Sequence, residues 1–276
     1  ESRAGPQTPN LPSNHPNYSL PAHNSSFYTS IKPQSKMKLI LAGATGLLGT
    51  EIMKQSLQIR EITQVIALAH QPVQLDKSID SSKLKIIVLR DYGEYPDDVK
   101  AEFANADACI WAVSVTPLRT SKAELNRVFH DCTKLGFEAM YEAGPARPFR
   151  FMYLSADGIF RDPTKKAVIM ADYHMIRCNA ELMVLKFPTE NEGVEVCIAR
   201  PGVIANPSTW SRALVANLFR IVGFFGRSLP NIQRSELAAA VLNQVMDGFE
   251  KEALLNADLV RIGQRELKFR SMPYRF

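Results

Sequence analysis

The stretch KLILAGATGLLGTEIMKQ, which begins at Lys38, constrains the fold of this 276-residue chain more than any other segment. A short apolar run is followed by three regularly spaced glycines and then by a segment of helix length. Glycine permits a turn with positive φ and lets the backbone approach a ligand closely, while the free N–H groups at a helix start bind phosphate. In this context the motif predicts a dinucleotide-binding loop, rather than tight turn geometry alone. The loop residues expected to contact the dinucleotide are Gly43, Thr45, Gly46, Leu47, Leu48 and Gly49.

From Met37 onward, short apolar runs rich in β-formers alternate with segments of helix length. Strands are predicted at KLILAG from 38, QVIALA from 64, LKIIVL from 84, DACIWAVS from 107, FRFMYLS from 149 and VEVCIA from 194. Amphipathic helices are predicted at 47–58, 122–143 and 171–187. Apolar runs without strict alternation suit strands buried on both faces, and helices between them suit right-handed crossovers. The sequence therefore predicts an α/β fold built on a doubly wound parallel sheet.

The chain divides into three predicted parts. Residues 1–36 are rich in Pro, Ser and Asn and lack the pattern of a signal peptide, so we expect a disordered tail. Residues 37–206 form the predicted dinucleotide-binding domain, and Met37 is a candidate first residue of the native or minimal protein. Residues 207–276 are predicted to form a small, helical, substrate-side region on the same unit. It contains a helix-like stretch from 209 that is too short and too charged to span a bilayer, a second helix over 234–249 and the run ADLVRIG.

Residues after the second and third predicted strands are expected to bind the adenosine half of the dinucleotide. The sequence ALAHQP has no Asp or Glu to hold the ribose hydroxyls of NAD, which favours NADP(H) over NAD(H). His70 could donate a hydrogen bond to a 2′-phosphate or stack on adenine, or be an ordinary surface residue. Asp91 is placed to accept from the adenine amino group, with Tyr92 alongside, or it serves as a turn residue. The fourth strand is expected to run under the dinucleotide at Ala112, Val113 and Ser114.

These features together resemble the short-chain dehydrogenase/reductase superfamily. Within it the chain is most similar to the atypical Tat-interacting-protein-like, NAD(P)H-binding group and its fungal relatives. The resemblance covers about residues 37–265, and its motifs are GATGLLG from 43, Asp91, YLSADG from 153, Tyr173, ARPGV from 199, SLPN from 228 and LLNADLVRIG from 254. It implies a Rossmann-like fold that binds NADP(H), with a serine and a Tyr-x-x-x-Lys pair facing the nicotinamide. It also places the backbone of Pro201, Gly202 and Val203 near the nicotinamide.

Carried over by position, the catalytic residues that the resemblance implies are Ser155, Tyr173 and Arg177, with arginine in place of lysine. A nearby cation stabilises a phenolate and lowers a tyrosine pKa from its usual value of about 10, so that tyrosine can act as a general acid or base. Arginine supplies a permanent charge but does not release a proton in a relay. In the structural alternative, Arg177 pairs with Glu181 on the helix surface, Tyr173 is a packing residue and Ser155 ties down its loop.

The leading hypothesis is an NADP(H)-dependent oxidoreductase that acts on the carbonyl or alcohol of a small, largely apolar metabolite. A second is a non-redox isomerase, dehydratase or cyclase with a structural dinucleotide, which the missing lysine favours. A third, suggested by NmrA-like relatives, is a redox-sensing regulatory protein that binds NADP.

Charge and cysteine usage limit the remaining classes of function. The 33 Lys and Arg are scattered among 28 Asp and Glu, so the net charge of +5 does not predict nucleic-acid binding. Four widely spaced cysteines suggest neither a disulfide framework nor a metal site. We therefore predict a cytoplasmic protein without a metal or a transmembrane segment, with a homodimer left open.

Overall fold

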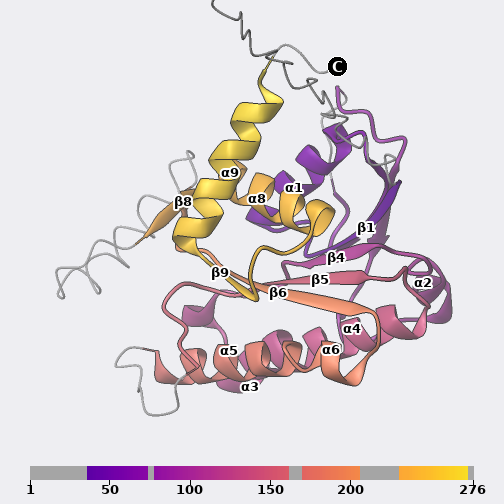
Figure 1. Ribbon diagram of the computed structural model, residues 1–276. Helices are drawn as coiled ribbons and strands as arrows, with labels where there is room; N and C mark the ends of the chain where they lie inside the picture. The colour runs from indigo at the N-terminus through magenta and orange to yellow at the C-terminus, as the bar shows by residue number, and fades with distance from the viewer. Residues whose placement is uncertain (1–35, 74–77, 162–169, 206–229, 273–276) are drawn as a thin grey trace, which may run out of the picture. The chain divides into compact units, whose positions relative to one another are not determined.

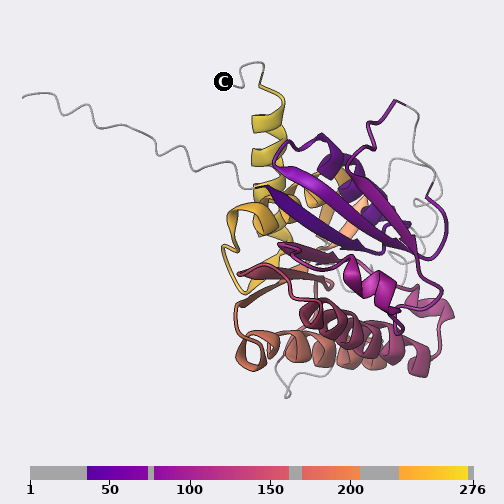
Figure 2. The ribbon, with the colours of Figure 1, turned by 90° about the vertical axis from the view of Figure 1, so that its right-hand side faces the viewer.

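A computed structural model describes residues 36–73, 78–161, 170–205 and 230–272 (Figure 1). Within these residues a seven-stranded parallel sheet runs in the order β3-β2-β1-β4-β5-β6-β9. Its strands are β1 (Met37–Ala42), β2 (Ile62–Ala69), β3 (Leu84–Val88), β4 (Ala108–Trp111), β5 (Phe149–Leu154), β6 (Val194–Arg200) and β9 (Ala253–Leu255). Strand order reverses direction between β1 and β4, which is where ligands bind in open sheets of this kind. The twist of the sheet is visible in Figure 2.

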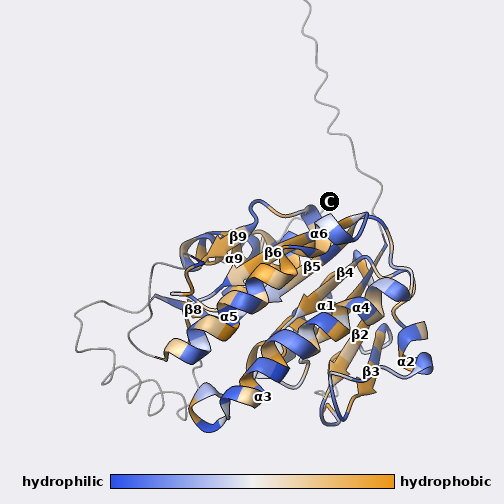
Figure 3. Cartoon of the chain, turned by 90° about the horizontal axis from the view of Figure 1, so that it is seen from below, coloured by the Kyte–Doolittle hydropathy of each residue, from blue (hydrophilic) through white to orange (hydrophobic). Residues whose placement is uncertain are grey.

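Helices cover both faces of the sheet. On one face lie α1 (Leu47–Gln58), α8 (Arg234–Asp247) and α9 (Asn256–Arg270), with α8 packed on both α1 and α9. The other face carries α3 (Lys122–Asn126), the π-helical turn η2 (Arg127–Asp131), α4 (Cys132–Glu142), α5 (Ala171–Val184) and the short α6 (Phe187–Glu190). The short α2 (Asp97–Ala101) and the 3₁₀ turn η1 (Pro117–Arg119) lie in connections. Figure 3 shows the apolar strands beneath helices whose outward sides are hydrophilic.

Alternation along the central strands explains the two helix layers. In β1, Leu39 and Leu41 belong to the core under α1 and α8, whereas Ile40 and Ala42 belong to the core under α4 and α5. Successive side chains of a strand point to opposite faces, so a strand covered on both sides must be apolar throughout. The doubly wound parallel sheet predicted from these runs is confirmed.

All six predicted strands are present, and the three helix predictions correspond to α1, to the continuous segment α3-η2-α4 and to α5. The seventh strand, β9, was not predicted. Neither was the separate parallel ribbon of β7 (Val203–Ala205) and β8 (Asn231–Gln233). Each of these strands has only three residues, too few to show a periodic pattern.

The predicted C-terminal region is described only in part. The helix-like stretch from 209 lies outside the described residues, as does nearly all of the predicted tail 1–36. The helix predicted over 234–249 is α8, and the run ADLVRIG lies within α9. Because β9 pairs with β6, residues 230–272 also contribute to the main sheet. The division at residue 206 between a dinucleotide-binding domain and a C-terminal region stays a prediction. Of the helices that the structure describes, none combines the length and hydropathy needed to cross a bilayer.

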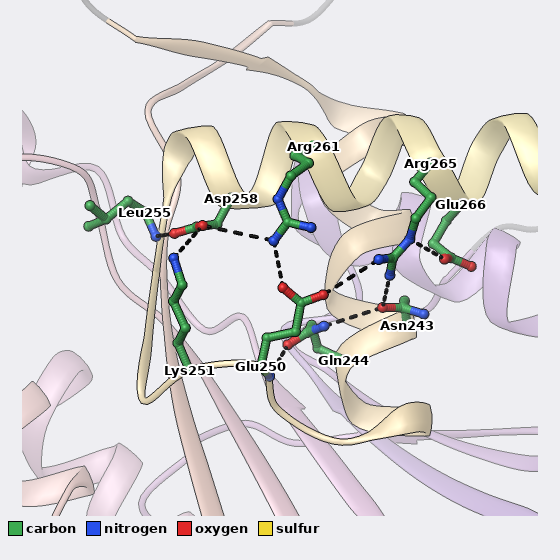
Figure 4. A network of polar contacts seen from close by, with 9 residues as sticks. All are labelled: Asn243, Gln244, Glu250, Lys251, Leu255, Asp258, Arg261, Arg265 and Glu266. Atoms are coloured by element: carbon green, nitrogen blue, oxygen red, sulfur yellow. Dashed lines mark hydrogen bonds and ion pairs between the residues drawn. The ribbon is translucent and has the colours of Figure 1, made fainter.

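Polar contacts join α9 to the connection between α8 and β9 (Figure 4). Glu250 accepts from Arg261 at 2.5 Å and faces Arg265 at 3.6 Å, while Lys251 donates to Asp258 at 2.6 Å. The basic side chains are about half exposed, so each pair contributes only about 0–1 kcal/mol. The network joins α9 to residues 250 and 251, just before β9, and adds little to the stability of the fold.

Candidate active site

The glycine loop between β1 and α1 is folded so tightly that two of its positions exclude a side chain. Gly43 has φ of +85°, and a Cβ there would lie 2.7 Å from the carbonyl oxygen of Ala112. At Gly49 a Cβ would lie 2.1 Å from the carbonyl oxygen of Gly43. The start of α1 has no side-chain cap and no acidic residue in its first turn. Its N–H groups are therefore available to an anion.

We expect Gly49→Ala to destabilise the fold by about 1–3 kcal/mol, because the added methyl group meets backbone that can move only with the loop. Displacement of the loop should also weaken dinucleotide binding at least about tenfold, a loss of about 1.4 kcal/mol. Chemical denaturation and fluorescence titration with NADPH measure the two effects. Gly263→Ala is the matched control, because its Cβ would lie 2.1 Å from the Glu236 carbonyl oxygen, a comparable clash at a residue that lines neither of the two cavities beside the loop. Wild-type affinity in Gly49→Ala would contradict the assigned role of the loop.

Two cavities meet at this loop. The first, cavity A, has a volume of about 190 Å³. It brings together nine of the residues predicted to bind the cofactor: Gly43, Thr45, Gly46, His70, Asp91, Tyr92, Ala112, Val113 and Ser114. The second, cavity B, has a volume of about 940 Å³. It shares Gly46 and residues 112–115, which directly follow β4, with cavity A.

Cavity A also contains a charge cluster that sequence analysis did not predict. Arg127 donates from Nη1 to both carboxylate oxygens of Asp91, at 2.8 and 2.9 Å, and binds Glu124 through Nε and Nη2, both at 2.8 Å. The Gly93 N–H, which donates to Asp91, and the Arg127 guanidinium lower the pKa of the Asp91 carboxyl, although partial burial opposes them. Recognition of adenine by Asp91 stays a prediction. The spacing of Glu124 and Arg127 on a helix was the available signal.

Tyr92 lines cavity A and also supports the glycine loop. Its side chain is buried, its hydroxyl donates to the Leu68 carbonyl at 2.8 Å, and it accepts from the Gly43 N–H at 3.0 Å. Burial raises the pKa of this phenol to about 12, so it stays protonated at neutral pH. His70 packs edge-on against the Tyr92 ring, with Nδ1 3.0 Å from the Leu89 carbonyl oxygen. Tyr92 thus ties the first glycine of the loop to the end of β2.

Cavity B collects the residues predicted for catalysis. Its wall includes Ser155, Tyr173 and Arg177, together with Leu47, Leu48, Gly49 and Pro201. Gly202 and Val203 do not line it: the Gly202 N–H donates to Asn256 Oδ1 at 2.8 Å, and Val203 belongs to β7. A Cβ on Gly202 would lie 2.0 Å from the Pro230 carbonyl oxygen, so this glycine allows close approach of the two chain segments. Ile204, which was not predicted, lines the cavity.

Arg177 is almost fully buried, at 3% exposure, and its charge faces aromatic rings. It donates from Nη1 to the Tyr153 hydroxyl at 3.1 Å and from Nη2 to the Leu154 carbonyl at 2.7 Å. Its Cζ atom lies 4.4 Å from the ring centroid of Phe129 and 6.0 Å from that of Tyr173. Nε has no hydrogen-bond partner among the described residues. The surface pair of Arg177 with Glu181, considered as a structural alternative, is not the arrangement found.

Tyr173 is half-buried, and its ring meets Phe129 edge-on at 5.8 Å. No described residue forms a hydrogen bond with its hydroxyl. Packing therefore holds the ring, while the hydroxyl is not committed to a structural contact within the described chain. Phe129 comes from the π turn η2, an irregularity that often accompanies functional sites.

Glu181 forms a buried ion-pair cluster behind Ser155. Its carboxylate binds Arg200 and also accepts from Arg161 Nε at 3.0 Å. Burial alone would raise the pKa of Glu181, but the guanidinium groups of Arg200 and Arg161 lower it. The Ser155 side chain is 6% exposed, and its hydroxyl forms no hydrogen bond of ordinary geometry within the described residues. The sequence did not predict that Glu181 would bind Arg200 and Arg161. The available signal was its position four residues after Arg177 on the same helix face.

Of the cysteines, Cys132 lines cavity A, where its Sγ lies 3.7 Å from Arg127 Nη1 and 3.9 Å from Asp91 Oδ1. All four are free thiols, and Cys109, Cys132 and Cys197 are buried. Among the described residues, no group of three or more His, Cys, Asp and Glu is placed to hold a metal ion.

The geometry of a glycine loop at the start of α1 agrees with the sequence comparison. A model of the NAD(P)H-binding family matches residues 43–247, most of the chain. The chain belongs to the NAD(P)H-binding family. Solved reductase structures share its fold at low identity. The PhqB reductase domain of Penicillium fellutanum is 18% identical with a TM-score of 0.59, over 81% of this chain and 67% of that one. Gre2 of Candida albicans, in complex with NADPH, is 16% identical with a TM-score of 0.58, over 79% and 77%.

A curated fungal protein is also similar to this NAD(P)H-binding chain. Leucinostatins biosynthesis cluster protein T of Purpureocillium lilacinum is 28% identical over 122 residues. The match spans 44% of each protein, so less than half of the relative's length is covered.

Proposed function

We propose that the chain is an NADP(H)-dependent oxidoreductase of the atypical short-chain type that reduces a carbonyl, or oxidises an alcohol, on a small and largely apolar metabolite. One observation carries the proposal. The uncommitted Tyr173 hydroxyl, the buried Arg177 cation and the unpartnered Ser155 hydroxyl line one cavity that begins at the glycine loop. The similarity to a protein of a biosynthetic cluster supports a small-molecule substrate.

The residues present fit a nicotinamide dinucleotide. The loop provides a cradle that a side chain on Gly49 would fill, and Ser155 Oγ and Arg177 Nε are buried polar atoms without partners among the described residues. The loop and α1 would hold the pyrophosphate, cavity A the adenosine half and cavity B the nicotinamide half. When bound, the nicotinamide supplies the hydride, or accepts it in the reverse direction.

Within cavity B, Tyr173 donates a proton to the carbonyl oxygen as that oxygen gains negative charge. Ser155 donates a hydrogen bond to the same oxygen and orients it. The Arg177 charge, which aromatic rings rather than carboxylates surround, favours the phenolate that Tyr173 leaves behind. Since both Nη groups are bound inside the protein and a guanidinium does not give up its proton, Tyr173 regains a proton from water in the cavity.

The preference for NADP(H) rests on the end of β2. No carboxylate stands there, and His70 lines cavity A with its Nδ1 turned to Leu89. Arg127 is the second group in this cavity that could meet a 2′-phosphate, although Asp91 and Glu124 already bind it. We expect NADPH to bind more tightly than NADH, as measured by fluorescence titration.

Loss of reduced-nicotinamide absorbance during incubation with a panel of apolar ketones and aldehydes tests the proposal. We expect oxidation of NADPH that depends on both protein and carbonyl compound, with one alcohol formed per NADPH. Tight binding of NADPH with no turnover across the panel would contradict the proposal.

The burial of Arg177 favours a second candidate, a non-redox isomerase, dehydratase or cyclase with a structural dinucleotide. An arginine fixed between Tyr153 and Leu154 still supports proton transfer by Tyr173, but it does not take the part of a lysine in a proton relay. Product formation without a change in nicotinamide absorbance would identify this second function.

A further inference from the structure

The two cavities differ in charge. Cavity A contains the carboxylates of Asp91 and Glu124 together with Arg127. Among the described residues that line cavity B there are two arginines, Arg119 and Arg177, and no carboxylate. The remaining wall is neutral and includes Leu47, Leu48, Val113, Val115, Pro117, Leu154 and Ile204. The described wall of cavity B is therefore largely apolar and carries positive charge without a carboxylate.

Arg119 is the freer of these two cations. It ends the turn η1 and is exposed, and its guanidinium group forms no hydrogen bond or ion pair with any described residue. Arg177, in contrast, uses both Nη groups inside the protein. All five N–H donors of Arg119 are thus available to a ligand.

The segment that carries Arg119 is joined to the catalytic side of cavity B. Lys122, three residues after Arg119, donates to Asp172 at 2.7 Å, and Asp172 immediately precedes Tyr173. The Ser121 side chain accepts from the Glu124 N–H and caps α3, which defines the end of the loop. Arg119 and Tyr173 therefore line the same cavity on segments that this ion pair joins.

We propose that Arg119 binds an anionic group of the substrate, so that the substrate is an apolar carbonyl compound that also carries a carboxylate or a similar anion. This inference rests on the proposed function, because it assigns a substrate class to the same site. Guanidinium pairs with carboxylate through two parallel hydrogen bonds, which fixes orientation as well as affinity. The pair holds the carbonyl in register with Tyr173 and Ser155. The dinucleotide's pyrophosphate has its own partner in the N-terminus of α1.

Calorimetry on the protein saturated with NADP⁺ tests the proposal, because hydride transfer to a ketone does not occur in that complex. The probes are benzoylformate and 4-oxo-4-phenylbutyrate, each compared with its methyl ester. In benzoylformate the carboxylate is bonded directly to the carbonyl carbon. In 4-oxo-4-phenylbutyrate two methylene groups separate them. The variants are Arg119→Gln and a matched control, Arg60→Gln, which changes an exposed arginine that lines neither cavity.

We expect at least one acid to bind about tenfold more tightly than its ester, since a charge-assisted pair contributes about that factor. Arg119→Gln should remove the preference, while Arg60→Gln retains it and both variants keep the wild-type NADP⁺ affinity. A wild-type protein that prefers neither acid, or a preference that survives in Arg119→Gln, overturns the proposal. The proposal is also overturned if Arg119→Gln weakens NADP⁺ binding as much as it weakens binding of the acid, because the arginine then belongs to the cofactor site. A reductase that turns over the esters as well as the acids retains the proposed function and loses only this inference.

Discussion

Replacement of Tyr173 by phenylalanine is expected to lower kcat for carbonyl reduction by about 10²–10⁴-fold, the range for loss of a general acid. The hydroxyl is the only group removed, and the edge-on contact of the ring with Phe129 remains. Dinucleotide affinity and the free energy of unfolding should therefore stay near their wild-type values. Steady-state kinetics with a saturating carbonyl compound, together with NADPH titration, measure the effect.

Tyr141→Phe is the matched control, because the Tyr141 hydroxyl donates to the Glu192 carbonyl at 3.3 Å and Tyr141 does not line cavity B. It should leave kcat unchanged. Arg177→Met removes the charge near Tyr173 and should lower kcat, whereas Arg177→Lys, which keeps a positive charge, should retain more of the activity. Unchanged kcat in Tyr173→Phe would leave this tyrosine a packing residue.

Glu181→Gln is expected to destabilise the fold by about 3–5 kcal/mol, the cost of breaking a buried ion pair. The substitution removes the buried carboxylate charge that Arg200 and Arg161 share, and among the described residues Arg161 keeps only its pair with the exposed Glu252. The comparison is Glu195→Gln, which breaks the half-exposed pair with Arg150 and should cost only about 0–1 kcal/mol. Urea denaturation of both variants measures the difference.

The same pair of variants predicts a pH dependence with a definite sign. The folded-state pKa of Glu181 lies below its ordinary value of 4.5, so its contribution to stability is present above that value and is lost as pH falls through the folded pKa. The gap in unfolding free energy between wild type and Glu181→Gln should be constant at neutral pH and narrow below about pH 4.5. A gap that does not change with pH would show that hydrogen bonding, not charge, accounts for the role of Glu181.

Local sequence patterns were sufficient for the core of the fold. The apolar runs at β1, β2, β4 and β5 are long enough to identify strands buried on both faces, and the glycine spacing identified the loop between β1 and α1. Strand β9 and the ribbon of β7 and β8 could not be found this way. Each has three residues and depends on partners distant in the chain, such as Pro230 for Val203.

The sequence could place together the candidate residues that follow strands, although their roles stay predictions. His70, Asp91, Ser114 and Ser155 follow strands, and the carboxyl ends of parallel strands meet at one edge of a sheet. Tyr92 also follows a strand, yet its side chain turns inward to hold Gly43. Periodicity does not specify which way a loop side chain turns.

The sequence alone determined that this chain builds a parallel sheet with a tight glycine loop before its first helix, because glycine spacing and strand burial are local properties. Only the tertiary structure decided the electrostatics of the site. Arg177 could have paired with Glu181 on a helix surface, since the two are four residues apart. Instead Arg200 and Arg161 come from β6 and the loop after β5 to bind Glu181, and Arg177 turns inward toward Phe129 and Tyr153. Which charge meets which is set by contacts between distant segments.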